Sequence, residues 1–171
     1  LYPVYIVMTL LCMILLYFSG AGGFADCLNM ALITISSAGI PAIYGDALSQ
    51  GTSQVVIVLF LLFSVMNWDF HYMRLNRKKL RYGNELEYKG LLITILAGAV
   101  FIIVLDGSYS FDRMWAAFFS AVSAASTSGV RPGGEQGNFV EFGLPVAIIL
   151  MLLAAIGGAV ISPSGGLKQL R

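Results

Sequence analysis

Four long apolar runs restrict the fold of this chain more than any other feature of its sequence. They cover residues 2–18, 53–72, 88–105 and 142–161. Each is close to the roughly 20 residues that an α-helix needs to cross about 30 Å of hydrocarbon. Only 11% of the residues are Asp, Glu, Lys or Arg, whereas soluble domains contain about 25%. The runs therefore predict an all-α membrane protein with four membrane-spanning helices.

Two shorter apolar segments, at residues 24–40 and 111–130, lie between these runs and are interrupted by Ser, Thr and Gly. Segments of this length fit re-entrant elements, which enter and leave the membrane on one side, better than spans. The sequence starts at Leu1 and stops at Arg171, soon after the last run. We therefore expect the chain to be part of a longer polypeptide.

Four alternating helices would place most of the positive charge on one side of the membrane. By the positive-inside rule, the basic link between the second and third runs is cytoplasmic. Both re-entrant segments then lie on the outer side, where excess acidic residues would raise the local cation concentration; the same acids could simply solvate loops. The inner cations are Arg74, Arg77, Lys78, Lys79, Arg81, Lys89, Lys168 and Arg171, and the outer acids are Asp26, Asp46, Asp106, Asp112, Glu135 and Glu141, against Arg113 and Arg131.

The two halves of the sequence share one pattern, which aligns when Gly39 is placed over Gly129, 90 positions later. Residues 35–40 (ISSAGI) then lie over residues 125–130 (ASTSGV). Each stretch follows a short apolar segment of helical character. A repeat of this length suits a duplicated membrane module, so we expect two tandem helix–pore-loop–helix units. The expected division is residues 1–75 for the first unit, 76–87 for the basic cytoplasmic link and 88–171 for the second unit.

Small hydroxyl residues and glycine in a non-helical membrane stretch require an explanation, because unpaired backbone groups are tolerated there only inside protein or beside a water-filled cavity. Carbonyls turned toward a cavity can replace the water around a cation, and glycine permits the backbone angles this needs. The preceding short helix would aim its partly negative C-terminal end at the same cavity. The alternative is a helix-packing face rich in small residues. Two such stretches at matching positions favour a cation pore.

Three longer stretches carry a family signal: residues 67–92 (NWDFHYMRLNRKKLRYGNELEYKGLL), 118–130 (FFSAVSAASTSGV) and 156–171 (IGGAVISPSGGLKQLR). Together they resemble the Trk/Ktr/HKT superfamily of potassium transporters, especially its bacterial TrkH/TrkG branch. The resemblance covers nearly the whole chain, and the closing stretch is its most specific part. The matching positions are Asn67, His71, Tyr82, Glu87, Gly157, Gly158, Ser162, Gly165, Gly166, Leu167, Lys168 and Arg171.

The resemblance implies four linked, non-identical units in a pseudo-fourfold ring around one pore, of which this chain looks like the second and third. It also implies one selectivity-filter glycine per unit, and an intramembrane gate at the glycine-rich break of the last span. Carried onto this sequence, the filter consists of Ile35, Ser36, Ser37, Ala38 and Gly39 in the first unit and Ala125, Ser126, Thr127, Ser128 and Gly129 in the second. The gate consists of Gly157, Gly158, Ser162, Pro163, Gly165, Gly166 and Lys168.

The chain departs from the family at several positions. Val160, Ile161 and Pro163 stand where the family's gate has small residues, Gly or Thr, so we expect a stiffer and more apolar gate. Asp69 and His71 are ionisable residues inside a span, which makes them functional suspects. Because they are near the cytoplasmic end, we interpret Asp69 as a paired or snorkelling side chain, with a role at the pore entrance or in a partner contact as the alternative.

These features together predict uptake of K⁺ across the cell membrane through a carbonyl filter and an intramembrane gate, with K⁺ against Na⁺ left open. The resemblance implies as partners the remaining units, a second copy of the transporter and a cytoplasmic nucleotide-binding regulatory subunit, besides membrane lipid. We expect no cofactor, no metal beyond the permeating ion, no nucleic-acid partner and no enzymatic activity. Two alternatives stay open: a secondary transporter with its substrate at a broken helix, and a structural membrane subunit without a pore of its own.

Overall fold

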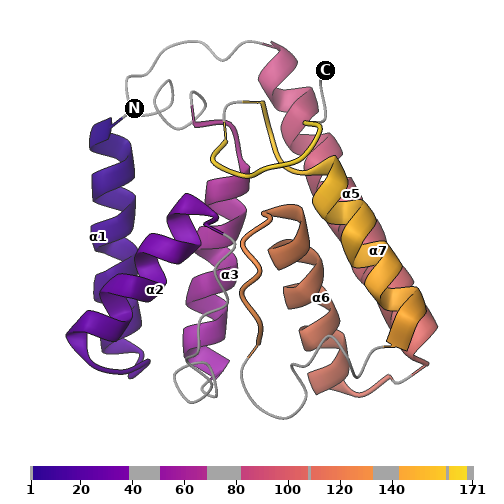
Figure 1. Ribbon diagram of the computed structural model, residues 1–171, viewed down its shortest axis with the longest axis horizontal. Helices are drawn as coiled ribbons and strands as arrows, with labels where there is room; N and C mark the ends of the chain where they lie inside the picture. Colours follow the sequence, from indigo (N-terminus) through magenta and orange to yellow (C-terminus); the bar gives the residue numbers. More distant parts are fainter. Residues whose placement is uncertain are drawn as a thin grey trace.

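The computed structural model describes residues 2–38, 51–68, 82–107, 109–132, 143–160 and 162–168. In these ranges the regular structure is α-helical throughout, and no strand occurs (Figure 1). The helices are α1 (Tyr2–Phe18), α2 (Phe24–Ser36), α3 (Gly51–Val65), α5 (Tyr82–Asp106), α6 (Phe111–Ala125) and α7 (Gly143–Ile156).

Helices α1, α3, α5 and α7 occupy the four apolar runs, and α2 and α6 occupy the two shorter segments. By length and composition, α5 is the one described helix that could cross a membrane: Glu87–Asp106 has 20 residues and a mean hydropathy of 2.3. Helices α1, α2, α3 and α7 are apolar but have 10–17 residues. Helix α7 ends at Ile156, five residues before the end of its apolar run, because the chain turns at Gly157 with φ 69°.

The two sets of three helices repeat one arrangement. In each, the short helix packs against both longer helices of its set, α2 against α1 and α3, and α6 against α5 and α7. Figure 1 shows α2 and α6 starting at one edge of the molecule and ending near its middle, well short of the opposite edge. This is the geometry expected of re-entrant helices, and it directs the C-terminal ends of both toward the interior.

The two sets meet where α3 packs against α6. At this junction Trp115 Nε1 donates a hydrogen bond of 2.6 Å to Gln54 Oε1. The core is formed by buried apolar residues from all six helices, among them Ile57, Ile95 and Phe119.

Large apolar side chains also cover much of the outer surface. Ile93 is 66% exposed and Phe101 61% exposed on α5, and Met151 is 73% exposed on α7. A helix that is apolar on every side belongs in a protein core or a membrane. Since these faces are not covered by the described residues, they suit contact with lipid or with further helices.

The boundaries of the expected units lie close to, or outside, the described residues. Helix α5 begins at Tyr82, so the last part of the expected link 76–87 is helical. Asp69, His71 and the cationic residues from Arg74 to Arg81 lie outside the described residues.

Candidate ion-conduction site

Helix α2 ends in a left-handed turn in the interior of the molecule. Ser37 follows the helix with φ 50° and ψ 42°, a conformation that is uncommon for a residue with a side chain. Its N–H donates to the carbonyl of Ile33, and the N–H of Ala38 donates to the same oxygen at 3.4 Å. The last turn of α2 contains no basic residue. The negative end of the helix dipole is therefore not neutralised from within the helix.

Helix α6 ends in the same way. Thr127 has φ 55°, and the N–H of Ser128 donates to Ser123 O at 3.2 Å. Each of these residues lies 90 positions after its counterpart at the end of α2. Among the described non-glycine residues, positive φ occurs only at Ser37, Thr127 and Lys168. The sequence repeat thus extends to a strained backbone turn, and strain of this kind concentrates at functional sites.

The hydroxyl groups of the second turn bind one another and the backbone carbonyls of the same turn. Ser123 Oγ donates to Val130 O at 2.6 Å, and Ser126 Oγ donates to Ser128 Oγ at 2.9 Å. All three serines are fully buried. These side chains therefore hold the turn in shape. Gly129, directly after them, has φ 66° and is exposed.

The boundaries of the expected non-helical stretches need correction. Ile35 and Ser36 belong to the last turn of α2, and Ala125 belongs to the last turn of α6. Ala125 is a strong helix former, and the Ser36 hydroxyl bonds back within its helix, to Leu32 O at 2.6 Å. Gly39, the expected filter glycine of the first unit, lies outside the described residues.

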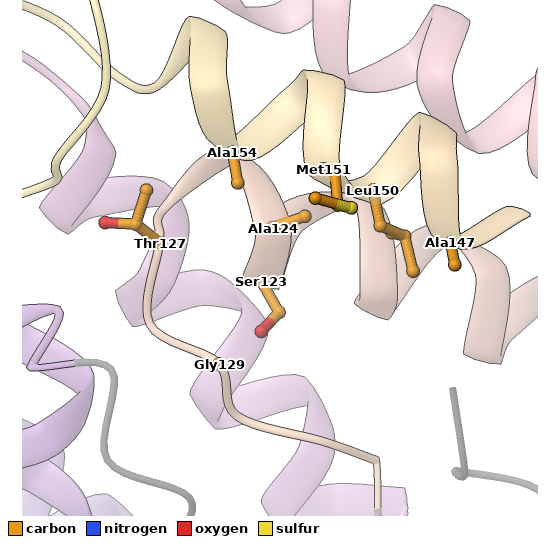
Figure 2. A pocket seen from close by; sticks show the side chains of 8 residues that line it. All are labelled: Ser123, Ala124, Thr127, Gly129, Ala147, Leu150, Met151 and Ala154. Carbon is orange, nitrogen blue, oxygen red and sulfur yellow. The ribbon is translucent and has the colours of Figure 1, made fainter. Parts of the chain in front are cut away.

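A cavity of about 360 Å³ opens between the second turn and α7 (Figure 2). On the side of α7 the lining residues are apolar. On the opposite side the cavity is lined by the end of α6 and the turn that follows it. The lining residues are Ser123, Ala124, Thr127, Gly129, Ala147, Leu150, Met151 and Ala154.

Beyond α7 the chain folds back on itself in a loop, residues 157–168, which we call the gate loop. The loop closes where the N–H of Leu167 donates to Ala155 O at 2.8 Å and the N–H of Lys168 donates to Ile156 O at 3.1 Å. Figure 1 shows this loop, in yellow, passing over the interior end of α6.

Two glycines allow the loop to close this tightly. Gly157 and Gly166 both have positive φ, and their backbones are in contact. A Cβ added at Gly166 would lie 2.6 Å from the Cα of Gly157. The glycine-rich composition of the closing motif is therefore explained by close backbone packing, in addition to any role in bending.

Oxygen atoms of the loop surround the ammonium group of Lys168. Lys168 Nζ donates to Ser162 O at 3.2 Å, to Ser162 Oγ at 3.3 Å and to the carbonyl of Ser164. Ser162 Oγ and Ser164 Oγ are 2.6 Å apart, while Pro163 between them is exposed. A cation carried by the chain itself thus occupies the carbonyl groups of this loop. Ile161 and Arg171 lie outside the described residues.

The gate loop contacts the turn that follows α6 directly. The N–H of Gly165 donates to Thr127 Oγ1 at 2.8 Å. The structure therefore brings together two groups of residues that the sequence separates by nearly forty positions. Sequence analysis proposed both groups but gave no indication that Thr127 would link them.

Glu87 matches the family in sequence, but sequence analysis did not predict that its carboxylate is buried beside the loop. Glu87, at the start of the apolar part of α5, accepts a hydrogen bond of 2.6 Å from the N–H of Val160. The available signal was an acidic residue that adjoins a membrane-length apolar run, since such residues are costly to bury. No group of three or more His, Cys, Asp or Glu side chains that could hold a metal ion occurs in the part of the chain that the structure describes.

Comparison with known proteins identifies relatives of this chain. No known protein-family profile matches the sequence. The chain is 28% identical over its whole length to the Trk system potassium uptake protein TrkH of Escherichia coli K12, of which it covers 36%. It is 30% identical over 98% of its length to an uncharacterized cation transporter of Methanocaldococcus jannaschii, of which it covers 33%. The crystal structure of the potassium transporter TrkH from Vibrio parahaemolyticus superposes on 98% of the chain with a TM-score of 0.73 at 20% identity, and 37% of that protein is matched.

The chain is homologous to the TrkH potassium uptake proteins. The resemblance to the Trk/Ktr/HKT superfamily is thereby confirmed, as is the fold class of an all-helical chain with two helix–pore-loop–helix units. The chain spans about a third of the length of the TrkH proteins that it matches.

Proposed function

We propose that this chain forms two units of a larger TrkH-like pore through which K⁺ enters the cell. The observation that carries the proposal is the pair of left-handed turns at Ser37 and Thr127, 90 positions apart, each at the interior end of a re-entrant helix. Repeated strain at symmetry-related positions is expected where backbone oxygens must point at a common axis.

In this proposal, backbone carbonyls of residues 35–39 and 125–129 replace the water around the ion. The negative ends of α2 and α6 add a field that favours a cation at the same place. The buried serines of the second turn fix the spacing of the carbonyls, because each hydrogen bond of a serine hydroxyl restricts the backbone of the turn. K⁺ is the expected ion, by analogy with the substrate named for the TrkH relatives.

The gate loop obstructs the path on the inner side of this filter. Its residues Gly157, Gly158, Gly165 and Gly166 let backbone pack on backbone, so the closed loop leaves little space. Opening requires that the N–H of Gly165 leave Thr127 and that the loop move away from the end of α6. Val160, whose apolar side chain is 42% exposed, fits the expectation of an apolar gate.

Two units cannot close a fourfold ring. We propose that further units complete the pore, that two such transporters associate, and that a cytoplasmic nucleotide-binding subunit regulates the gate. The exposed apolar faces of α5 and α7 suit lipid and neighbouring units. In the cell membrane, the pore loops face outward and the basic link faces the cytoplasm. The chain catalyses no reaction.

The test is ion flux in liposomes that contain the whole transporter, with Gly39→Ser and Gly129→Ser beside the wild type. We expect each variant to lose K⁺ over Na⁺ selectivity. At Gly129, where φ is 66°, a Cβ is strained and turns the carbonyl away from the axis; Gly39 is the counterpart that the sequence repeat predicts. If both variants kept wild-type selectivity, the filter assignment would be wrong.

A further inference from the structure

Glu87 is a buried carboxylate at the start of the apolar part of α5. Its side chain is 4% exposed, and it is the first residue of the 20-residue apolar part of α5. Removing a carboxylate from water is costly unless hydrogen-bond donors replace the water. Residues of this kind in membrane segments are therefore candidates for a functional role.

The donors that Glu87 receives come from two other parts of the chain. Val160 N–H, in the gate loop, donates to Oε1 at 2.6 Å. Asn67 Nδ2, just after α3, donates to Oε2 at 3.3 Å. One carboxylate thus joins the second unit's first long helix, the end of the first unit and the gate loop.

The gate loop has a second contact at the same place. The N–H of Ala159 donates to Val65 O, at the end of α3, at 3.0 Å. A Cβ on Gly158 would lie 2.2 Å from Ser164 Oγ and 3.0 Å from that same Val65 oxygen, so a larger residue there would push the loop away from its place against α3. The loop is therefore held at one end by Glu87 and α3 and at the other by Thr127.

We infer that Glu87 is a positioning residue for the gate: its carboxylate holds the loop closed across the junction of the two units. This inference rests on the proposed function, since it gives the gate loop its closing contact. The bond from Val160 is short and charge-assisted, and bonds of this kind are roughly twice as strong as neutral ones. Opening the loop breaks the hydrogen bond from the Val160 N–H and leaves the Glu87 carboxylate without this donor. The cost of breaking the bond favours return of the loop to the closed position.

The experiment compares Glu87→Met with Glu87→Gln in the whole transporter, after replacing the buried Cys12 and Cys27 by Ala. Met fills a similar volume without a strong acceptor, so the helix packing is kept, whereas Gln keeps an oxygen for the Val160 N–H. Val160→Cys is added to each, because Cys retains the backbone donor. The readouts are the rate at which a water-soluble thiol reagent modifies Cys at position 160, and resting K⁺ flux in liposomes.

Asp106→Asn is the matched control. Asp106 is an acidic residue of the same helix, about 28 Å away at 1.5 Å per residue, and it pairs with Arg113 at 3.7 Å. It makes no contact with the gate loop that would predict an effect on labelling at position 160.

We expect Glu87→Met to raise the labelling rate and the resting flux by roughly tenfold, the change that corresponds to loss of a charged hydrogen bond. Glu87→Gln should restore most of the wild-type behaviour, and Asp106→Asn should match the wild type. Equal labelling of Glu87→Met and the wild type would overturn the inference. So would equal effects of Met and Gln, since these would indicate a loss of packing. Thiol labelling requires no transport, so a chain that proved not to conduct K⁺ would leave this result readable.

Discussion

The ends of the two re-entrant helices have the same backbone but different side-chain partners. Ser37 and Thr127 both adopt a left-handed turn. Ser37 Oγ lies 3.5 Å from Ser64 Oγ on α3, within its own unit. Thr127 Oγ1 instead accepts a bond of 2.8 Å from Gly165 in the gate loop. Duplication has therefore kept the geometry that positions carbonyls, while the contact that couples a turn to a gate exists in the second unit.

The largest effect on this difference between the two units is expected at Gly157, where the gate loop begins. We expect Gly157→Ala to open the loop, because a Cβ would overlap Gly165 O and lie 2.8 Å from the Cα of Gly166. With φ at 69°, strain and overlap together should cost roughly 2–4 kcal/mol. Resting K⁺ flux in liposomes should rise at least about thirtyfold.

Gly51→Ala, at the start of α3, is the matched control for that variant. A Cβ there would meet nothing within 4 Å, so flux should stay at the wild-type level. If the two substitutions had equal effects, close packing would not explain the glycines of the gate loop.

A smaller effect is expected at the two equivalent turn residues. Thr127→Val keeps the β-branched shape but removes the acceptor for Gly165 N–H, at a cost of about 1 kcal/mol. Resting flux should increase roughly fivefold relative to the maximal flux. Ser37→Ala should change this ratio little, because a hydroxyl contact of 3.5 Å is close to the limit for a hydrogen bond. Equal changes in both variants would show that the gate does not distinguish the units.

The smallest effect is expected at the junction of the units. Trp115→Phe removes the donor of the 2.6 Å bond to Gln54 Oε1 and keeps an aromatic ring in place. We expect a loss of about 1 kcal/mol in stability, seen as a lower midpoint of thermal unfolding in detergent, with the resting flux unchanged. A change in flux of the size expected for Thr127→Val would mean that the junction itself takes part in gating.

The sequence was sufficient to predict the elements and their repetition. Apolar runs and small-residue stretches report on local environment, so the positions of all six described helices and the equivalence of Ser37 and Thr127 followed from pattern alone. The limits of the non-helical stretches were wrong, because Ile35, Ser36 and Ala125 each continue a helix.

Contacts that depend on the chain folding back could not be predicted. The glycines of the closing motif signalled an unusual backbone, but not that Gly166 would lie against Gly157. Likewise, Glu87 and Val160 are separated by 73 positions, and no local pattern records that a loop N–H would reach that carboxylate.

The central claim is that the turns at residues 37 and 127 face one ion path. It is tested most directly by an anomalous difference map from crystals of the whole transporter grown in Rb⁺, a heavier substitute for K⁺. We expect a peak bounded by backbone oxygens of residues 35–39 and 125–129, on the outer side of the gate loop. A map in which the two turns face separate surroundings, with no Rb⁺ between them, would contradict it.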